Sequence, residues 1–283
     1  MTLDKTTRRR GEPVRLLAYI FLGTGALATL YPLYWMLTAA TLGESEIFKS
    51  PPRLLPGGNF FANLELLSRS APFVRTLLNS IFVAGVTTVS TVLLSALAGY
   101  AFAKFRFRGR GVMFAVVLGT LMLPTEIMVV PLFIIMLQLG WVDSFLALTV
   151  PYLVTAFGVF LMRQQMMGFP NDLIDAARID GNGELGVFFR VVLPNMKAAC
   201  AALGIVTFMS QWGNFLWPLV VMSTPEKFTY PLMLANLAER QGGAVQYGPI
   251  MVASVIGLIP LVALFFFFQK YIVSGVFGGS LKE

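Results

Sequence analysis

Three groups of residues in this chain have types and spacing that could take part in chemistry. The chain has no histidine and one cysteine, Cys200, so the commonest general base and the usual zinc ligand sets are missing. The groups are a carboxylate in an apolar stretch, a run of amide and indole side chains, and a glycine-punctuated polar segment, namely Glu126, 211–217 and 168–194. These types favour binding and packing, and we expect a chain without catalytic residues of its own.

Glu126 lies within a long apolar stretch between Pro124 and Pro131. A carboxylate inside a membrane is costly, so it should face a bundle interior or a wet cavity. It is therefore a candidate for the path or the gate of a transported solute. The alternatives are a structural hydrogen-bond partner or a position near the outer interface.

The amide and indole run contains Gln211, Trp212, Asn214 and Trp217. Aromatic rings can stack on the C–H faces of a sugar, and amides can bond its hydroxyl groups. We take Gln211, Trp212 and Asn214 as candidates for a substrate path. Interfacial anchoring by tryptophan and hydrogen bonding between helices explain the same residues equally well.

The polar segment predicts two short helices joined by a glycine turn. Pro170 and Asn171 are typical of a helix start, and Gly181 suits the left-handed position just after a helix. A second helix would run from about Gly183 to Val192, and Leu193-Pro194 would end it. Residues 181–186 match G-x-G-x-x-G, but no strand precedes them, so we exclude a dinucleotide site. The chain has no P-loop, and we expect it not to hydrolyse ATP.

The elements that position these groups are apolar segments in a membrane. Hydrophobic residues make up 57% of the 283 residues and charged residues only 12%, so lipid must be the solvent for much of the chain. Crossing the hydrocarbon core takes roughly 20 apolar residues. The sequence predicts an all-α protein with six transmembrane helices, near Leu16–Ala40, Phe73–Ala103, Val112–Leu137, Phe145–Met162, Ala198–Met222 and Pro249–Phe268.

The positive charges predict the orientation of the chain. With both ends in the cytoplasm, 15 of the 21 lysines and arginines lie on the inner side. This sorting explains the net charge of +7 without nucleic acid. The first apolar stretch follows Arg8-Arg9-Arg10, but it is too long for a signal peptide, so we expect a retained helix. The predicted parts are a cytoplasmic tail, a first helix with its outer loop, a five-helix core with a cytoplasmic loop at 163–197, and a second tail, at 1–15, 16–72, 73–271 and 272–283.

The glycine-punctuated segment resembles the EAA loop of bacterial ABC-importer permeases. Asp175-Ala176-Ala177, then Gly181, then Leu193-Pro194 follow the pattern of that family, with Asp175 in place of its glutamate. Further stretches are similar to the carbohydrate-uptake branch, of the maltose and glycerol-phosphate transporter type: Asn79-Ser80, 101–109, Met122-Leu123-Pro124, 215–219 and 269–275. One departure is Gly213, between Trp212 and Asn214, where the family usually has a side chain.

The resemblance implies half of a translocation pore in the bacterial inner membrane. Its implied partners are a second homologous permease, two ATPase subunits that bind ATP and magnesium, and an extracytoplasmic solute-binding protein. The loop between the fourth and fifth helices would couple them through Asp175, Ala176, Ala177, Asp180, Gly181, Leu193 and Pro194. In the family, Ala176, Ala177 and Gly181 would allow close approach to the ATPase, and Asp175 would form the polar anchor.

The implied activity is transport of a sugar or sugar-like solute by alternating access, with no cofactor in this chain. A disaccharide, an oligosaccharide, a polyol, glycerol phosphate and another polar solute remain open. A secondary transporter is a rival, although we see one intramembrane carboxylate and no clear inverted repeat. A membrane enzyme is a second rival, and it lacks a clustered polar constellation.

Overall fold

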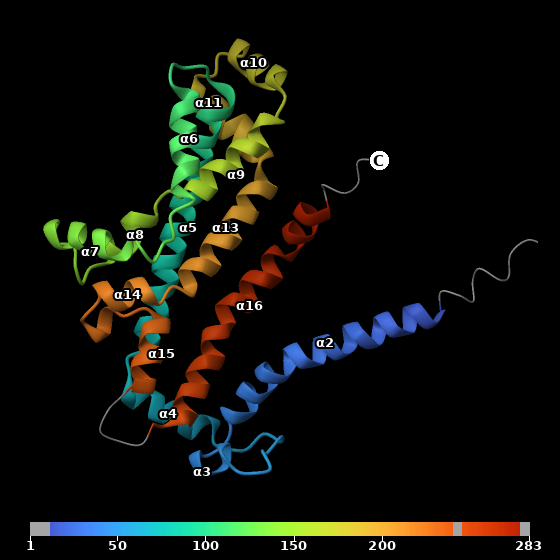
Figure 1. The fold of residues 1–283 in the computed structure, drawn as a ribbon, viewed down its shortest axis with the longest axis vertical. Coiled ribbons are helices and arrows are strands. Elements are labelled where there is room, and N and C mark those ends of the chain that lie inside the picture. The colour runs from blue at the N-terminus through green and yellow to red at the C-terminus, as the bar shows by residue number, and fades with distance from the viewer. Residues whose placement is uncertain (1–11, 240–244, 278–283) are drawn as a thin grey trace, which may run out of the picture. The chain divides into compact units, whose positions relative to one another are not determined.

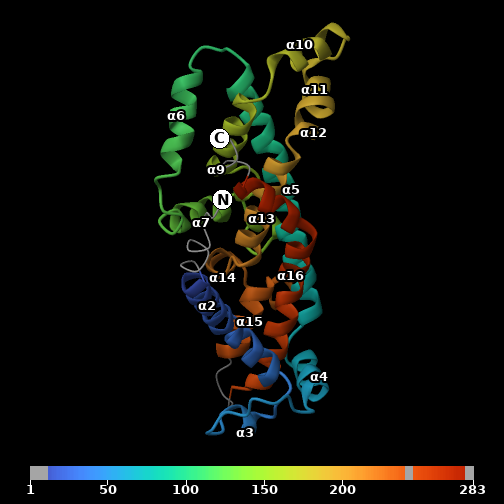
Figure 2. The same cartoon turned by 90° about the vertical axis from the view of Figure 1, so that its right-hand side faces the viewer.

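The computed structural model describes residues 12–239 and 245–277, with side chains at 15–239 and 245–269. These residues form helices and connecting turns, with no strand among them (Figures 1 and 2). Most of the predicted tail 1–15, the end of the predicted tail 272–283, and residues 240–244 of the predicted outer loop lie outside the described residues. The chain divides into two compact units, 1–71 with 237–256, and 72–236 with 257–283.

The first unit contains α2 (Glu12–Ala39), α3 (Glu44–Ile47), α4 (Phe60–Ser70) and the start of α16 (Tyr247–Phe277). Its core includes Ala39, Leu42, Leu67 and Val252, all fully buried. The Asn63 amide ties the segment after α2 to α4, donating to the carbonyls of Ala40 at 3.0 Å and Leu42 at 2.9 Å. By contrast, every side chain of α2 from position 15 to 34 is exposed, although the helix is apolar.

The second unit is built around α5 (Phe73–Lys104), α9 (Ala156–Met167) and α13 (Lys197–Trp212), which pack against one another. Small residues let α5 and α9 approach closely, as they do in membrane bundles. A Cβ on Gly99 would lie 2.8 Å from the backbone nitrogen of Arg163, and one on Gly158 would lie 2.4 Å from the Ser95 hydroxyl oxygen. Side chains at these two glycines would force the helices apart.

Shorter helices complete the second unit. The segment between α9 and α13 forms α10 (Asn171–Ile179), α11 (Glu184–Val187), the π-helical turn η2 (Phe188–Val192) and α12 (Leu193–Asn195). The others are α6 (Arg110–Thr120), α7 (Val129–Gln138), α8 (Phe145–Thr149), η1 (Val150–Tyr152), α14 (Leu216–Val221), η3 (Pro225–Lys227) and α15 (Tyr230–Glu239). The indole nitrogen of Trp217 in α14 donates to the carbonyl of Ala147 in α8 at 2.8 Å, which joins these two helices.

Four of the six predicted spans are long apolar helices in the described residues: Arg15–Ala39, Phe73–Lys104, Phe145–Met167 and Tyr247–Gln269. A fifth is reached if Glu184–Asn195 and Lys197–Trp212, which meet at 80°, count as one bent span. The spans predicted near Val112–Leu137 and Ala198–Met222 are not single helices, because the chain there forms the pairs α6 and α7, and α13 and α14.

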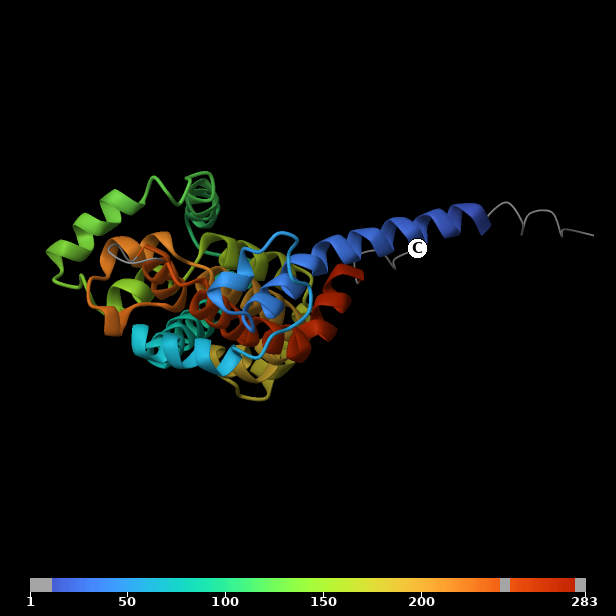
Figure 3. The ribbon, with the colours of Figure 1, turned by 90° about the horizontal axis from the view of Figure 1, so that it is seen from below.

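The two broken spans have local causes in the sequence. The first is interrupted at 121–128, between α6 and α7, and Figure 3 shows these as separate helices (in green) that point in different directions. Pro124 lies in this interruption, and a proline cannot donate the hydrogen bond that continues a helix. The second is interrupted at 213–215, after Trp212, and Gly213 at this break weakens helix continuation.

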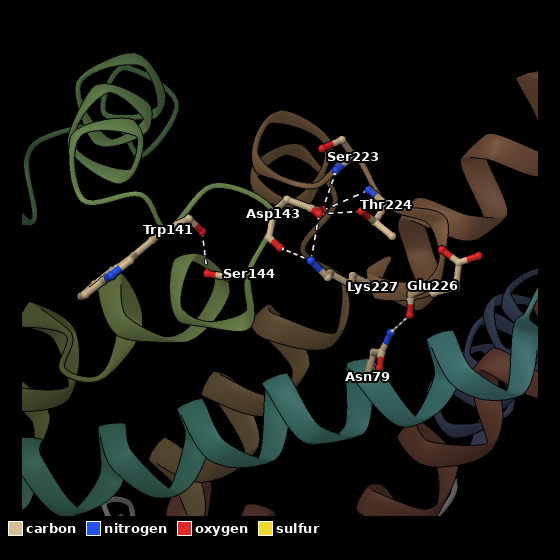
Figure 4. A network of polar contacts seen from close by, with 8 residues as sticks. All are labelled: Asn79, Trp141, Asp143, Ser144, Ser223, Thr224, Glu226 and Lys227. Atoms are coloured by element: carbon tan, nitrogen blue, oxygen red, sulfur yellow. Dashed lines mark hydrogen bonds and ion pairs between the residues drawn. The ribbon is translucent and has the colours of Figure 1, made fainter.

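A polar network joins the α7–α8 connection to the turns after α14 (Figure 4). The Asp143 carboxylate accepts hydrogen bonds from the backbone nitrogens of Ser223 and Thr224, both at 3.0 Å, and from the Thr224 hydroxyl at 2.5 Å. The Lys227 ammonium lies 2.9 Å from the same carboxylate. Burial would raise the pKa of Asp143, but these hydrogen bonds outweigh it and lower that pKa.

Asp143→Asn should lower the stability of this network. Asp143 has a φ of 58°, which asparagine also tolerates, so the backbone turn is kept while the charge is lost. We expect the free energy of unfolding to fall by about 1–2 kcal/mol, measured as a lower thermal midpoint of the purified protein. Glu226→Gln, an exposed carboxylate beside the network, is the control and should leave the midpoint unchanged. Equal midpoints for both variants would contradict this role for Asp143.

Candidate functional site

The segment between α9 and α13 folds as two short helices, as the sequence predicts. The first, α10, begins at Asn171 directly after Pro170. Gly181 has a φ of 80°, which confirms the predicted left-handed position after this helix. The second differs from the prediction, because helical structure continues through Leu193-Pro194 to Asn195. A proline is tolerated there because it stands in the first turn of α12.

One face of this segment is buried in the core of the second unit. Ile174, Ala177, Val187, Phe188 and Val192 pack in one cluster with residues of α5, α9 and α13, namely Ala96, Tyr100, Met162, Met166 and Leu203. Ala177 is only 6% exposed, so its side chain packs inward, whereas that of Ala176 is exposed. The predicted contact of Ala177 with a partner stays a prediction. The segment and the ends of the three helices therefore share one apolar core.

Other apolar side chains of this segment are exposed. Ile179 is 86% exposed and Leu185 is 68% exposed, on either side of the turn at Gly181. Leu173 and Phe189 are each 48% exposed on the same segment. We call Leu173, Ile179 and Leu185 the apolar tip. Exposed large apolar side chains on a segment outside the predicted spans are candidates for a protein interaction site. The sequence reasoning missed these residues, although their apolar type beside a glycine turn was a usable signal.

Arg178 forms one ion pair within α10 and one that joins α10 to α11. The Arg178 guanidinium contacts the Asp175 carboxylate at 2.9 Å and the Glu184 carboxylate at 2.8 Å. The hydrogen bonds to Glu184, followed by the bond to Asp175, raise the pKa of Arg178. The Asp175 side chain remains 61% exposed, so it keeps room for a second partner. Because these pairs are exposed, they orient the helices more than they stabilise the fold.

Lys104, the last residue of α5, contacts the start of α10. Its ammonium donates to the carbonyl of Phe169 at 2.5 Å and to the side-chain oxygen of Asn171 at 2.8 Å. One turn earlier on α5, the Tyr100 hydroxyl lies 3.5 Å from the Glu184 carboxylate. In the sequence, Lys104 is one of the 15 cations expected on the inner side, and nothing else distinguishes it. Its partners lie more than sixty positions away in the chain, so no local pattern could have found them.

A cavity of about 350 Å³ lies between the α8–α9 region and α13. Its polar lining comes from hydroxyl and amide groups, including Tyr152, Thr155, Thr207, Ser210, Gln211 and Asn214. Tyr152 and Asn214 lie together in this lining. Two of the four predicted path residues, Gln211 and Asn214, thus meet in one cavity.

The other two predicted path residues lie elsewhere. Trp212 is 5% exposed and stacks against Phe208, with ring centroids 5.9 Å apart, and against Tyr230, at 6.4 Å. Glu126 is exposed in the break between α6 and α7. It neighbours the cavity through Thr125, a lining residue whose hydroxyl lies 3.2 Å from its carboxylate. Roles for Trp212 and Glu126 in a solute path stay predictions.

Metal-binding clusters are absent from the part of the chain that the structure describes, since no three of its His, Cys, Asp and Glu residues come together in a suitable group. Two other features are candidates for function. One is the apolar tip, on a segment that packs against α5, α9 and α13. The other is the cavity whose polar lining consists of hydroxyl and amide groups.

Comparison with known proteins gives a family model and relatives that are all membrane components of transport systems. The family described as "Binding-protein-dependent transport system inner membrane component" matches residues 91–278. The arabinooligosaccharides transport system permease protein of Bacillus subtilis is 34% identical over 274 residues, covering 95% of this chain and 96% of that protein. The sn-glycerol-3-phosphate transport system permease protein of Yersinia pestis is 35% identical, covering 95% and 97%.

A solved structure shows the same fold. It is a crystal structure of a bacterial ABC transporter involved in the import of the acidic polysaccharide alginate, with a TM-score of 0.83. The match covers 96% of this chain and 99% of that chain, at 21% sequence identity. At this identity the likeness concerns the fold alone.

Proposed function

Because the chain belongs to the family of inner-membrane components of binding-protein-dependent transport systems, we propose that it is half of the pore of an importer for a neutral sugar. Its partners would be a second permease, two ATPase subunits that bind ATP and magnesium, and an extracytoplasmic solute-binding protein. Both chain ends would lie in the cytoplasm, as the sorting of positive charges favours. The broken helices α6–α7 and α13–α14 would complete six crossings.

The observation that carries the proposal is the geometry of the segment that contains α10 and α11. It exposes Ile179 and Leu185 outward while its other face shares a core with α5, α9 and α13. An ATPase that binds the tip and moves would carry these three helices with it. Alternating access needs such a rigid link between the ATPase and the spans, because binding energy must be converted into helix reorientation.

The cavity at Gln211 and Asn214 supports a neutral polyhydroxy solute. Its described lining contains hydroxyl and amide groups and no lysine or arginine. Such groups match sugar hydroxyls, whereas a phosphate is usually bound by cations. Glu126, next to the lining residue Thr125, would also repel an anion. The runner-up is glycerol phosphate or another polar solute, which the name of the Yersinia pestis relative favours.

We expect Gln211→Ala with Asn214→Ala to reduce solute stimulation of the ATPase of the whole complex by about tenfold. Each lost hydrogen bond to a solute costs roughly 1 kcal/mol, and two such losses exceed the 1.4 kcal/mol that correspond to a factor of ten. The measurement is ATP hydrolysis in proteoliposomes, with the binding protein loaded in turn with an arabino-oligosaccharide and with glycerol 3-phosphate.

Gln165→Ala is the matched control, because Gln165 is exposed near the opposite end of α9 and does not line the cavity. It should behave as the unmodified chain. Stimulation by glycerol 3-phosphate alone would overturn the choice of a neutral sugar. Full stimulation in the double variant would remove Gln211 and Asn214 from the solute path.

A further inference from the structure

A second, larger cavity lies on a different face of the second unit, between α5, α13 and α16. It has a volume of about 540 Å³ and an almost wholly apolar lining, with Val89 and Leu93 on α5, Phe208 on α13 and Leu264 on α16. Gly85 and Gly204 keep it open from two sides. A Cβ on Gly85 would have no atom within 4 Å, and one on Gly204 would make ordinary contacts with Thr88 at 3.6 Å and Val92 at 3.7 Å. We call this cavity the apolar groove.

One cation stands at one end of the apolar groove. Lys197, the first residue of α13, is the only charged residue in the described lining, and its side chain is exposed. The groove follows α13 from Lys197 to Phe208, about 16 Å at 1.5 Å per residue. Since the hydrocarbon core is about 30 Å thick, the groove spans about one leaflet. In the proposed orientation, Lys197 marks the cytoplasmic side.

We infer that the apolar groove holds an acyl chain of an anionic phospholipid from the cytoplasmic leaflet, with the Lys197 ammonium contacting the lipid phosphate. This rests on the proposed membrane orientation, but not on the choice of solute. The positive charge of Lys197 favours an anionic lipid as the occupant, because a lysine near the cytoplasmic surface attracts anionic headgroups by about 1 kcal/mol. An apolar helix of a partner would gain nothing from a lysine at this end.

The test counts lipids retained by the purified complex, by native mass spectrometry after exchange into phosphatidylglycerol or phosphatidylcholine. Gly85→Leu fills the groove without a backbone clash, and we expect it to remove one bound lipid per complex. Lys197→Gln should keep that lipid but reduce the preference for phosphatidylglycerol about fivefold. Gly119→Leu, also at an open position but outside the groove, is the control and should retain the full count.

An unchanged count in Gly85→Leu would overturn the inference, and so would loss of the second permease from that variant, because a protein helix would then fill the groove. A second measurement does not depend on any groove variant. Cys200 lines the groove and is the only cysteine of the chain, so it can carry a fluorophore in a complex whose partners lack cysteine. Lipids brominated on the acyl chain should quench this label, and absence of quenching would overturn the proposal.

The same two measurements separate this inference from the proposed function. Both read lipid binding and neither requires transport or a known solute. A complex that transports another solute but retains the lipid would contradict only the neutral-sugar proposal. A sugar importer with an empty groove would contradict only the lipid inference.

Discussion

Replacing Ile179 and Leu185 with glutamate is expected to separate this chain from the ATPase subunits proposed as its partners, without unfolding it. The two side chains are 86% and 68% exposed, so charges there meet water in the free chain and cost the fold little. In the proposed importer the same charges would be buried in the interface with the ATPase. Truncating a single buried anchor of an interface typically costs about 2 kcal/mol or more, which is a roughly 30-fold loss of affinity.

The measurement is co-purification of the ATPase with the permease pair, followed by transport in proteoliposomes. Phe61→Glu is the matched control, because Phe61 on α4 is 78% exposed but lies on the side that we predict to face away from the cytoplasm. It should leave ATPase binding intact. If the Ile179 and Leu185 variant still retained the ATPase, the tip would not be the docking element.

The tip also shows what the sequence could and could not predict. The two short helices and the left-handed Gly181 follow from local signals, namely Pro170 before a helix and a glycine after it. Local patterns are read from neighbouring residues, so they locate these features well. The apolar type of Ile179 beside this turn was visible in the sequence, but its exposure was not, because exposure depends on which face α5 and α9 cover.

The broken spans illustrate the same limit in the membrane. Apolar runs predicted membrane spans near 112–137 and 198–222, since membrane helices tolerate proline and glycine. The structure instead breaks the helices at 121–128 and after Trp212. Hydropathy measures burial in lipid and not backbone continuity. The cavity with Gln211 and Asn214 opens beside the second of these breaks, which places the candidate path residues where helical regularity is lost.

Lys104→Met is expected to weaken coupling while preserving the complex. Lys104 is the direct polar link from the end of α5 to the start of α10, through the Phe169 carbonyl and the Asn171 side chain. Methionine has a similar length and apolar stem but no donor, so both acceptors lose their partner. Hydrogen bonds to a charged group are worth about 1.5–3 kcal/mol. We therefore expect solute-stimulated ATP hydrolysis to fall at least about tenfold.

Two measurements separate the coupling of ATP hydrolysis to transport from the assembly of the complex. ATPase co-purification should stay normal, because the apolar tip is unchanged, while the transport per ATP hydrolysed falls. Arg106→Gln and Arg108→Gln are controls from the turn that follows Lys104. Both arginine side chains are exposed, and both variants should keep full coupling. Lys104→Arg should restore part of it, since guanidinium also donates to both acceptors.

The comparison between these variants decides how motion passes through the protein. If the shared apolar core of α10–α12 with α5, α9 and α13 were sufficient, Lys104→Met would couple normally, because that core is untouched. A loss of coupling confined to Lys104→Met would mean that the packed core alone lets α10 shift relative to α5. The ammonium would then fix the angle between them, and the cation at the end of α5 would be a positioning residue for transport as well as a determinant of orientation.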